Sequence, residues 1–331
     1  MRPAVRPSKL SPWWLGAGVA AVAVALVLGV SLGPVSLPPL EVAAQLLGLD
    51  SGLDEREAAI VTQIRLPRVL LGLLVGAMLA LAGGCFQGVF RNPLADPYLL
   101  GIAAGAGLGA TTAIAMRADQ VVVPIVAFVG AMVSAALTYV LGQGKNLILA
   151  GVAVSSFLAA AQTYVLQRNV DTIREVYSWL LGRLDTDGYR QIKLLLPYAL
   201  VATVVVLAMR RELDVLSVGD AEAASLGLHP QRSRLILLTA AALGTAAAVA
   251  VSGLIGFVGI IVPHIVRLLA GGSYRSILPL SVLFGAAFLA LVDLAARTVI
   301  APGELPIGVV TAFFGAPFFV LVLRMTRTVS L

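Results

Sequence analysis

Long runs of apolar residues separated by short polar segments dominate this chain from one end to the other. A helix needs about 20 mostly apolar residues to cross the hydrocarbon core of a bilayer, and ten stretches reach or approach that length. The pattern predicts an all-α, polytopic membrane protein with about ten transmembrane helices, in one domain that covers residues 1–331. The expected spans are 13–33, 69–90, 98–116, 121–142, 146–166, 191–209, 235–252, 254–270, 277–296 and 305–323.

Only the Gly-rich string SGLIG separates the seventh and eighth expected spans. Such a short link favours a broken or re-entrant helix. Non-helical backbone at membrane depth needs protein or a water-filled cavity around it.

The N-terminal segment predicts the orientation. Arg2, Arg6 and Lys9 precede the first apolar run, which is longer than the 7–15 residues of a signal-peptide core, so we expect an uncleaved first span. Trp13 and Trp14 then lie in the inner aromatic belt. Basic residues are slightly more frequent in the loops that this orientation places inside, which predicts cytoplasmic N- and C-termini.

The composition agrees with a membrane protein. Apolar residues make up 59% of the chain and charged residues 12%, against about 45–50% and about 25% in soluble domains. The net charge of +6 is explained by the positive-inside pattern, so we expect membrane lipid and no nucleic acid as partner. Cys85 is the single cysteine and fits a small buried residue.

Two loops are long enough to hold structure of their own. The expected outer loop 167–190 carries apolar residues at helical spacing, which predicts an amphipathic helix at the membrane surface. These residues are Ile173, Val176, Tyr177, Leu180 and Leu181. In the expected inner loop 210–234, Asp220 is placed to cap a short helix and Gly227 to end it.

Glycines recur inside the spans. Gly101, Gly105 and Gly109 form two overlapping GxxxG steps, which favour close helix packing.

Motifs for catalysis are missing from the sequence. Gly144 and Lys145 resemble part of a phosphate-binding loop, but the preceding glycine and the following Ser or Thr are absent. His229 and His264 have no nucleophile or carboxylate nearby in sequence. We therefore expect no enzyme activity, metal site or cofactor, and the energy for transport must come from a partner or an ion gradient.

Use of an ion gradient requires ionisable groups deep in the membrane. The candidates are Asp293 and Glu304. Arg297 follows Asp293 by four residues, which favours a structural ion pair on one helix face over a proton relay.

Seven segments, in order and with matching hydropathy, resemble the FecCD-type permeases, which import cobalamin, haem and ferric siderophores. The resemblance begins at Arg65, and the first 60 residues match in hydropathy alone. The segments are RLPR (65–68), QGVFRNPLADPYLLG (87–101), LAGVAVS (149–155), GDAEAASLG (219–227), GLIGFVGIIVPHIVRLL (253–269), PLSVLFGA (279–286) and ELPIGVVTAFFGAPFFVLVL (304–323).

The resemblance implies the type II ABC importer permease fold in a bacterial cytoplasmic membrane. Such a subunit pairs with a second copy, as a homodimer, or with a close paralogue, and one pathway follows the dimer axis. Two cytoplasmic ABC ATPase subunits bind below, and an extracytoplasmic substrate-binding protein docks above.

The resemblance also implies roles for particular residues. The segment that contacts the ATPase matches Gly219, Asp220, Ala223, Leu226 and Gly227. The arginines that dock the binding protein match Arg65, Arg68 and Arg297, although Arg65 and Arg68 also fit plain interface anchors. The cytoplasmic gate matches Gly144, Lys145 and Asn146, with a lysine where a small polar residue is more usual. Gln162 and Thr163 fall on a span that is similar to the pathway-lining helices of the family.

The sequence thus predicts the permease of a binding-protein-dependent ABC importer for a ferric siderophore, haem or cobalamin. The alternative is a proton- or sodium-coupled secondary transporter, and a membrane-bound enzyme is a weaker third reading. The sequence does not select among the three substrates.

Overall fold

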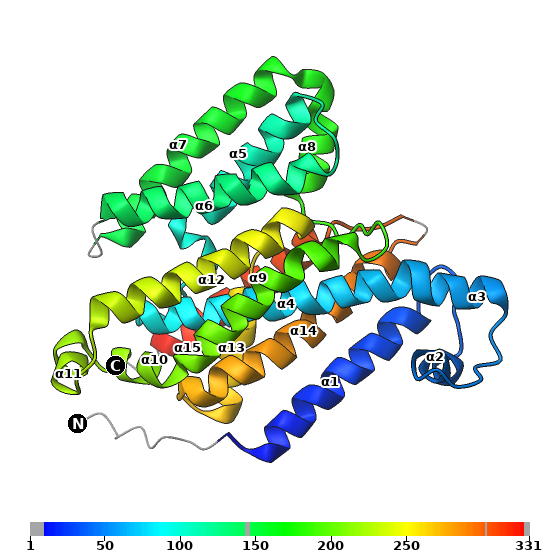
Figure 1. Ribbon diagram of the computed structural model, residues 1–331, viewed down its shortest axis with the longest axis horizontal. Helices are drawn as coiled ribbons and strands as arrows, with labels where there is room; N and C mark the ends of the chain where they lie inside the picture. The colour runs from blue at the N-terminus through cyan, green and yellow to red at the C-terminus, as the bar shows by residue number, and fades with distance from the viewer. Residues whose placement is uncertain (1–9, 143–145, 302, 328–331) are drawn as a thin grey trace.

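The computed structural model describes residues 10–142, 146–301 and 303–327, with side chains up to Val320. Its regular elements are helices that form two groups (Figure 1): α5 to α8 pack together at the top, and the others surround α4. The α-helices are α1 Pro12–Ser31, α2 Pro39–Leu46, α3 Glu55–Ala59, α4 Leu66–Val89, α5 Ile102–Ala115, α6 Val122–Gly142, α7 Leu147–Arg168, α8 Ile173–Leu180, α9 Arg190–Ala208, α10 Arg210–Leu216, α11 Asp220–Ser225, α12 Pro230–Ser252, α13 Val258–Ala270, α14 Tyr274–Thr298 and α15 Ile307–Arg327.

The ten expected spans correspond to seven long helices and three shorter ones. Helices α1, α6, α7, α9, α12 and α14, and the continuous stretch Glu55–Val89 that includes α4, are long and apolar enough to cross a membrane. The apolar helices Ile102–Ala115, Val258–Ala270 and Ile307–Val320 are shorter. At 1.5 Å per residue, the 14 residues of α5 cover about 21 Å, less than the ~30 Å hydrocarbon core. The 3-10 helix Pro97–Leu100 precedes α5 and extends it.

Helix α4 is the central element. It packs against α9, α12, α13 and α14, and 89% of its most apolar window is buried. At Gly83 a Cβ atom would lie 1.9 Å from the carbonyl oxygen of Gly259, so only glycine lets the backbones of α4 and α13 meet there. In α5, likewise, a Cβ at Gly105 would lie 2.3 Å from the carbonyl oxygen of Gly130 in α6, in agreement with the predicted packing role.

A π-helix, Ile60–Arg65, joins α3 to α4. Pro67 lies in the first turn of α4 and has no N–H to donate. The backbone N–H of Leu66 donates to the carbonyl of Val61, five residues back. This widened turn sets the direction in which Arg65 and Arg68 leave the helix.

The eighth span begins later than the predicted residue 254. Gly253 ends α12 with a positive φ of 68°, and α13 begins at Val258. Between them the backbone is not helical, and Phe257 has a left-handed conformation with φ +67°. The hydroxyl of Tyr98 accepts from the N–H of Ile255 at 3.2 Å and donates to its carbonyl at 3.0 Å. The predicted break is therefore present, and the protein itself, through Tyr98, satisfies the backbone N–H and carbonyl of Ile255.

The predicted amphipathic helix in segment 167–190 is α8, which packs on α5. Its buried side chains are Val176 and Trp179. Tyr177, predicted to lie on the apolar face, is 53% exposed. The prediction was wrong for Tyr177, because Val176 and Trp179 form the buried face of α8.

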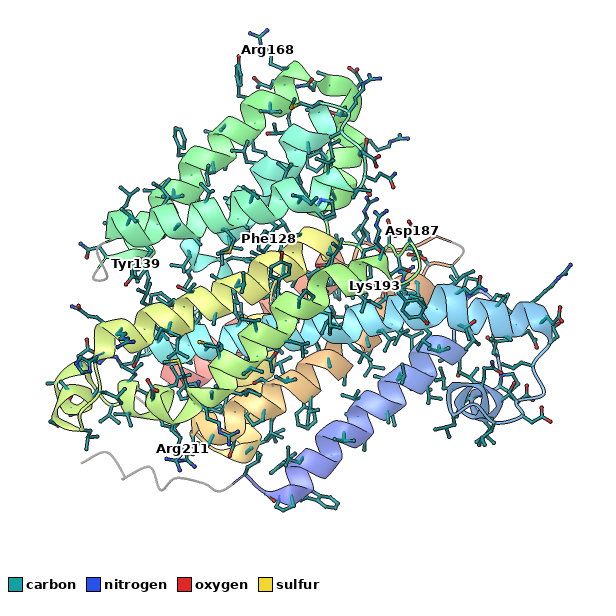
Figure 2. All side chains as sticks on the ribbon, viewed as in Figure 1. Phe128, Tyr139, Arg168, Asp187, Lys193 and Arg211 are labelled. Atoms are coloured by element: carbon teal, nitrogen blue, oxygen red, sulfur yellow. The ribbon has the colours of Figure 1, made fainter. Side chains whose placement is uncertain are left out.

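Polar side chains lie at the two ends of the helices. Lys193, near the start of α9, and Arg211, just after its end, lie at opposite ends of that helix (Figure 2). We call the end that carries α3 the α3 face and the end that carries α11 the α11 face (Figure 1).

Candidate functional site

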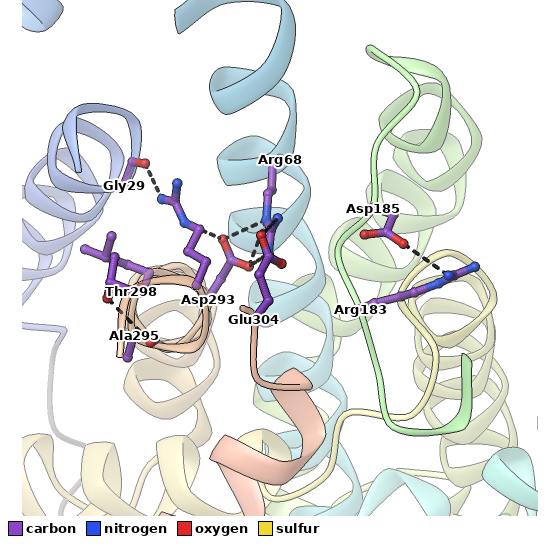
Figure 3. A network of polar contacts seen from close by, with 10 residues as sticks. Gly29, Arg68, Arg183, Asp185, Asp293, Ala295, Thr298 and Glu304 are labelled. Atoms are coloured by element: carbon purple, nitrogen blue, oxygen red, sulfur yellow. Dashed lines mark hydrogen bonds and ion pairs between the residues drawn. The ribbon is translucent and has the colours of Figure 1, made fainter. Parts of the chain in front are cut away.

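On the α3 face, Arg68 of α4 connects two acidic residues that lie far away in sequence (Figure 3). Its Nη2 atom lies 2.9 Å from Asp293 Oδ1 in α14 and 2.8 Å from Glu304 Oε2, just before α15. Its Nη1 donates to the other Glu304 oxygen at 3.0 Å. Arg68 lowers the pKa of Glu304 through these hydrogen bonds. The side chain of Arg68 is 17% exposed and that of Glu304 is 50% exposed.

Asp293 and Arg297 form the pair that the sequence predicted. Arg297 Nε lies 3.4 Å from Asp293 Oδ2, and the two side chains are 5% and 1% exposed. Arg297 also donates to the carbonyl of Gly29 in α1. The closer contacts of Asp293 are with Arg68, which the sequence did not reveal because 225 residues separate them.

Arg65 is buried at the start of α4. Its Nη1 donates to the carbonyls of Val30 and Ser31, both at 2.9 Å, and its Nη2 donates to the carbonyl of Val35. The guanidinium therefore satisfies the end of α1, and the residue is 6% exposed.

The three predicted docking arginines thus differ in access. Arg65 and Arg297 are buried among protein partners, whereas Arg68 borders a cavity of about 180 Å³. Arg183 also lines that cavity and lies 3.2 Å from Asp185, as Figure 3 shows. Docking at these arginines stays a prediction.

On the α11 face, the segment 210–234 folds into α10, α11 and the start of α12. Gly227 ends α11 with φ +83°, and the N–H groups of Gly227 and Leu228 donate to the carbonyls of Ala224 and Ala223. This pattern is a Schellman motif and agrees with the predicted helix end.

Asp220 does not cap α11, contrary to the prediction. The N-cap is Gly219, without a side-chain hydrogen bond, and Asp220 is the first helical residue. Its carboxylate instead accepts from Arg91, just beyond α4, and from Arg234 in α12. Neither arginine was a predicted site residue, since no local pattern connects them with Asp220.

The other predicted residues of α11 divide into buried and exposed. Ala223 is fully buried and holds the helix against its neighbours. Leu226 is 71% exposed, as is Val218 at 70%. The α11 face thus presents two large apolar side chains beside a short helix.

Of the predicted gate residues, Gly144 and Lys145 lie outside the described residues. Asn146 is exposed, and its N–H donates to the carbonyl of Gly142 at 3.0 Å. It lines a cavity of about 540 Å³ between the end of α4 and the start of α7.

Helix α7 has the lowest burial of the long helices, with 11% of its most apolar window buried. Thr163 is on its exposed side. Gln162 instead faces α5, where its Nε2 donates to Thr111 Oγ1 at 3.1 Å. The exposed side of α7 carries large apolar residues, among them Leu149, Val152, Phe157 and Tyr164. Beside them runs one stripe of small and polar residues, namely Ala153, Ser156, Ala160, Thr163 and Gln167.

Comparisons with known proteins identify the family. Residues 21–325 match the FecCD transport family. The chain is 41% identical over 283 residues to the cobalamin import system permease protein BtuC of Halobacterium salinarum, covering 83% of this chain and 76% of that protein. It is 36% identical over 305 residues to the Fe(3+)-citrate import system permease protein YfmE of Bacillus subtilis, covering 90% of each.

The fold has a close counterpart among solved structures. A metal-chelate type ABC transporter in an inward-facing conformation superposes with a TM-score of 0.86 and 30% sequence identity, over 95% of this chain and 100% of that one. The all-helical architecture is that of type II ABC importer permeases. The chain belongs to the FecCD transport family and is a multi-pass membrane permease, the transport subunit of an ABC importer whose ATPase activity lies in a separate subunit.

Proposed function

We propose that this permease imports cobalamin or an iron chelate across the cytoplasmic membrane, as one of two permease subunits that work with two ATPases and a substrate-binding protein. The observation that carries the proposal is the family match along residues 21–325, together with relatives that import cobalamin and Fe(3+)-citrate. Haem, which the sequence also suggested, falls in the same class of large metal chelates.

In this proposal the α11 face is cytoplasmic, and so are both termini. Arg210, Arg211, Arg232 and Arg234 fall in the loop between α9 and the body of α12, which supports this orientation under the positive-inside rule. The α3 face then points outward.

The pathway follows α7 and the axis between two permease copies. A stripe of small and polar side chains is poorly suited to lipid, and on α7 it remains exposed. Thr163 is part of that stripe. Gln162 supports it indirectly, because its hydrogen bond to Thr111 holds α7 against α5.

The α11 segment engages the ATPase. Exposed apolar side chains at the core of an interface contribute much of its binding energy, and Val218 and Leu226 are of that kind. The segment is compact because Ala223 is buried and Gly227 turns the chain.

The binding protein docks on the α3 face, where its acidic groups reach Arg68. Arg65 and Arg297 contribute by fixing the helices around Arg68, since both are bonded within the chain. Arg183 on the same cavity is a further basic group within reach of a partner.

Co-purification tests the proposal. A tagged permease, co-expressed with its ATPase and solubilised in mild detergent, should retain the ATPase in the wild type and lose it in Leu226→Asp. Val170→Asp is the matched control, because Val170 is 64% exposed and lies between α7 and α8, away from α11 (Figure 1). ATPase retained equally by both variants would contradict a role for α11 in the contact.

A further inference from the structure

Three charged residues from three separate elements meet on the α11 face. Arg91 Nη2 lies 2.6 Å from Asp220 Oδ1, and Arg234 donates to both carboxylate oxygens, at 2.8 Å from Nη1 and 2.6 Å from Nη2. The side chains of Arg91, Asp220 and Arg234 are 39%, 49% and 20% exposed. A two-pronged Arg–carboxylate contact fixes orientation as well as distance, so displacement of Asp220 must move both arginines.

The backbone at Arg91 is unusual. Arg91 has φ +51° and follows α4 at the position where a helix end of this kind usually has glycine. The N–H groups of Arg91 and Asn92 donate to the carbonyls of Gly88 and Gln87. A non-glycine residue in this conformation is strained.

Asp220 is the main polar connection between α11 and the rest of the chain. Within the described residues, it is the one residue of α11 whose side chain is hydrogen-bonded to another element. Ala223 supplies the buried apolar contact. Movement of α11 therefore acts on Arg91 and Arg234 through this carboxylate.

The two arginines form part of the wall of the 540 Å³ cavity. The end of α4 contributes Phe90 and Arg91, α12 contributes Arg234, and the start of α7 contributes Asn146 and Leu149. The three-residue cluster lies between α11 and this cavity.

We propose that Asp220, Arg91 and Arg234 form a link that passes the movement of α11 to α4 and α12 and thereby reshapes the cavity beside α7. Arg91 and Arg234 are positioning residues for transport. The inference rests on the proposed contact between α11 and the ATPase, and it adds the residues that receive the movement.

The test uses the complete importer, with ATPase and binding protein, in proteoliposomes. Asp220→Asn and Arg91→Gln should each lower substrate uptake per ATP hydrolysed by about tenfold, while the ATPase still co-purifies. The variant that combines Asp220→Asn with Arg91→Gln should transport no worse than either single variant, because each of the three variants breaks the same link. Arg91→Gln leaves the Arg234–Asp220 pair in place, which protects folding.

Arg117→Gln is the matched control. Arg117 also follows a helix with positive φ, 54°, and its aspartate partner Asp171 lies 3.2 Å away, between α7 and α8. The Arg117→Gln variant should leave substrate uptake per ATP hydrolysed unchanged. The link is overturned if Asp220→Asn and Arg91→Gln keep the wild-type ratio, or if they release the ATPase, which would make these residues ATPase contacts. Failure of the proposed function looks different, since the wild-type complex would then show no ATP-dependent uptake.

Discussion

The two ends of helix α4 carry ion clusters of opposite character. At its start, Arg68 meets Asp293, which is 1% exposed and also pairs with Arg297. Just past its end, Arg91 meets Asp220, whose side chain is 49% exposed. Both clusters connect distant segments through an arginine–aspartate contact, yet the aspartate is buried in one cluster and half-exposed in the other.

Because of this difference, the cluster at the start of α4 supports the fold, and the cluster past its end can change during transport. Removal of one partner from a buried ion pair leaves an uncompensated charge and is expensive, on the order of 3–5 kcal/mol. Exposed pairs contribute about 0–1 kcal/mol and can break and reform during a transport cycle. The start of α4 therefore holds α1, α14 and α15 in place, and its end is free to respond to a partner.

The largest expected effect belongs to the buried cluster. Asp293→Ala leaves Arg68 and Arg297 without their shared carboxylate and should destabilise the protein by about 3 kcal/mol or more. Thermal unfolding in detergent measures this, together with the yield of inserted protein. Asp293→Asn keeps the shape and some hydrogen-bonding capacity and should therefore lose less stability than Asp293→Ala. Equal stability of Asp293→Ala and the wild type would show that the pairing is unimportant.

A smaller effect on stability, together with a loss of transport, is expected at Gly227. A β-branched residue there must adopt the positive φ that ends α11, which costs about 1–2 kcal/mol. Gly227→Val should lower both uptake and stimulated ATP hydrolysis by about tenfold while insertion persists, and Gly227→Asn should be milder because Asn tolerates that conformation. Normal uptake by an inserted Gly227→Val variant would remove α11 from the coupling mechanism.

The smallest effect concerns association of the binding protein. Glu304 occupies the Nη1 atom of Arg68, so Glu304→Gln should remove that negative charge while Asp293 still holds the rest of the guanidinium. Association should then become a few-fold faster at low ionic strength, because charges at a rim mainly act on the association rate. The effect should disappear in high salt. Unchanged kinetics at low salt would argue against docking at Arg68.

The pH dependence of that effect has a defined sign. Arg68 lowers the pKa of Glu304 in the folded protein. The pair is therefore fully formed above the ordinary pKa of a glutamate and is lost as the pH falls through the lowered value. Wild type and Glu304→Gln should differ at neutral pH and converge only in strong acid.

Much of the fold could be predicted because membrane helices need long apolar runs. All ten expected spans correspond to helices, and the break before α13 follows from Gly253. The shorter elements α2 and α3 and the π-helix were not predicted, because they lack the long apolar runs on which the predicted spans rest.

The candidate site was predictable only where the signal is local. The Asp293–Arg297 pair lies four residues apart on one helix face, and Gly227 marks a helix end. Arg68 with Asp293, and Arg91 with Asp220, join segments 225 and 129 residues apart. Hydropathy contains no information on such contacts, so Asp220 was taken for a helix cap.

Reconstituted uptake tests the central claim, that this chain is an ATP-driven importer subunit and not an ion-coupled carrier. Proteoliposomes with the cognate ATPase, the binding protein and labelled cobalamin or iron chelate are compared with and without a protonophore. We predict that uptake requires ATP and survives the protonophore, and that Asp293→Asn retains it because Asp293 serves to hold arginines. Uptake that stops with the protonophore while ATP remains, and that Asp293→Asn also abolishes, would contradict this account in favour of a proton-driven carrier.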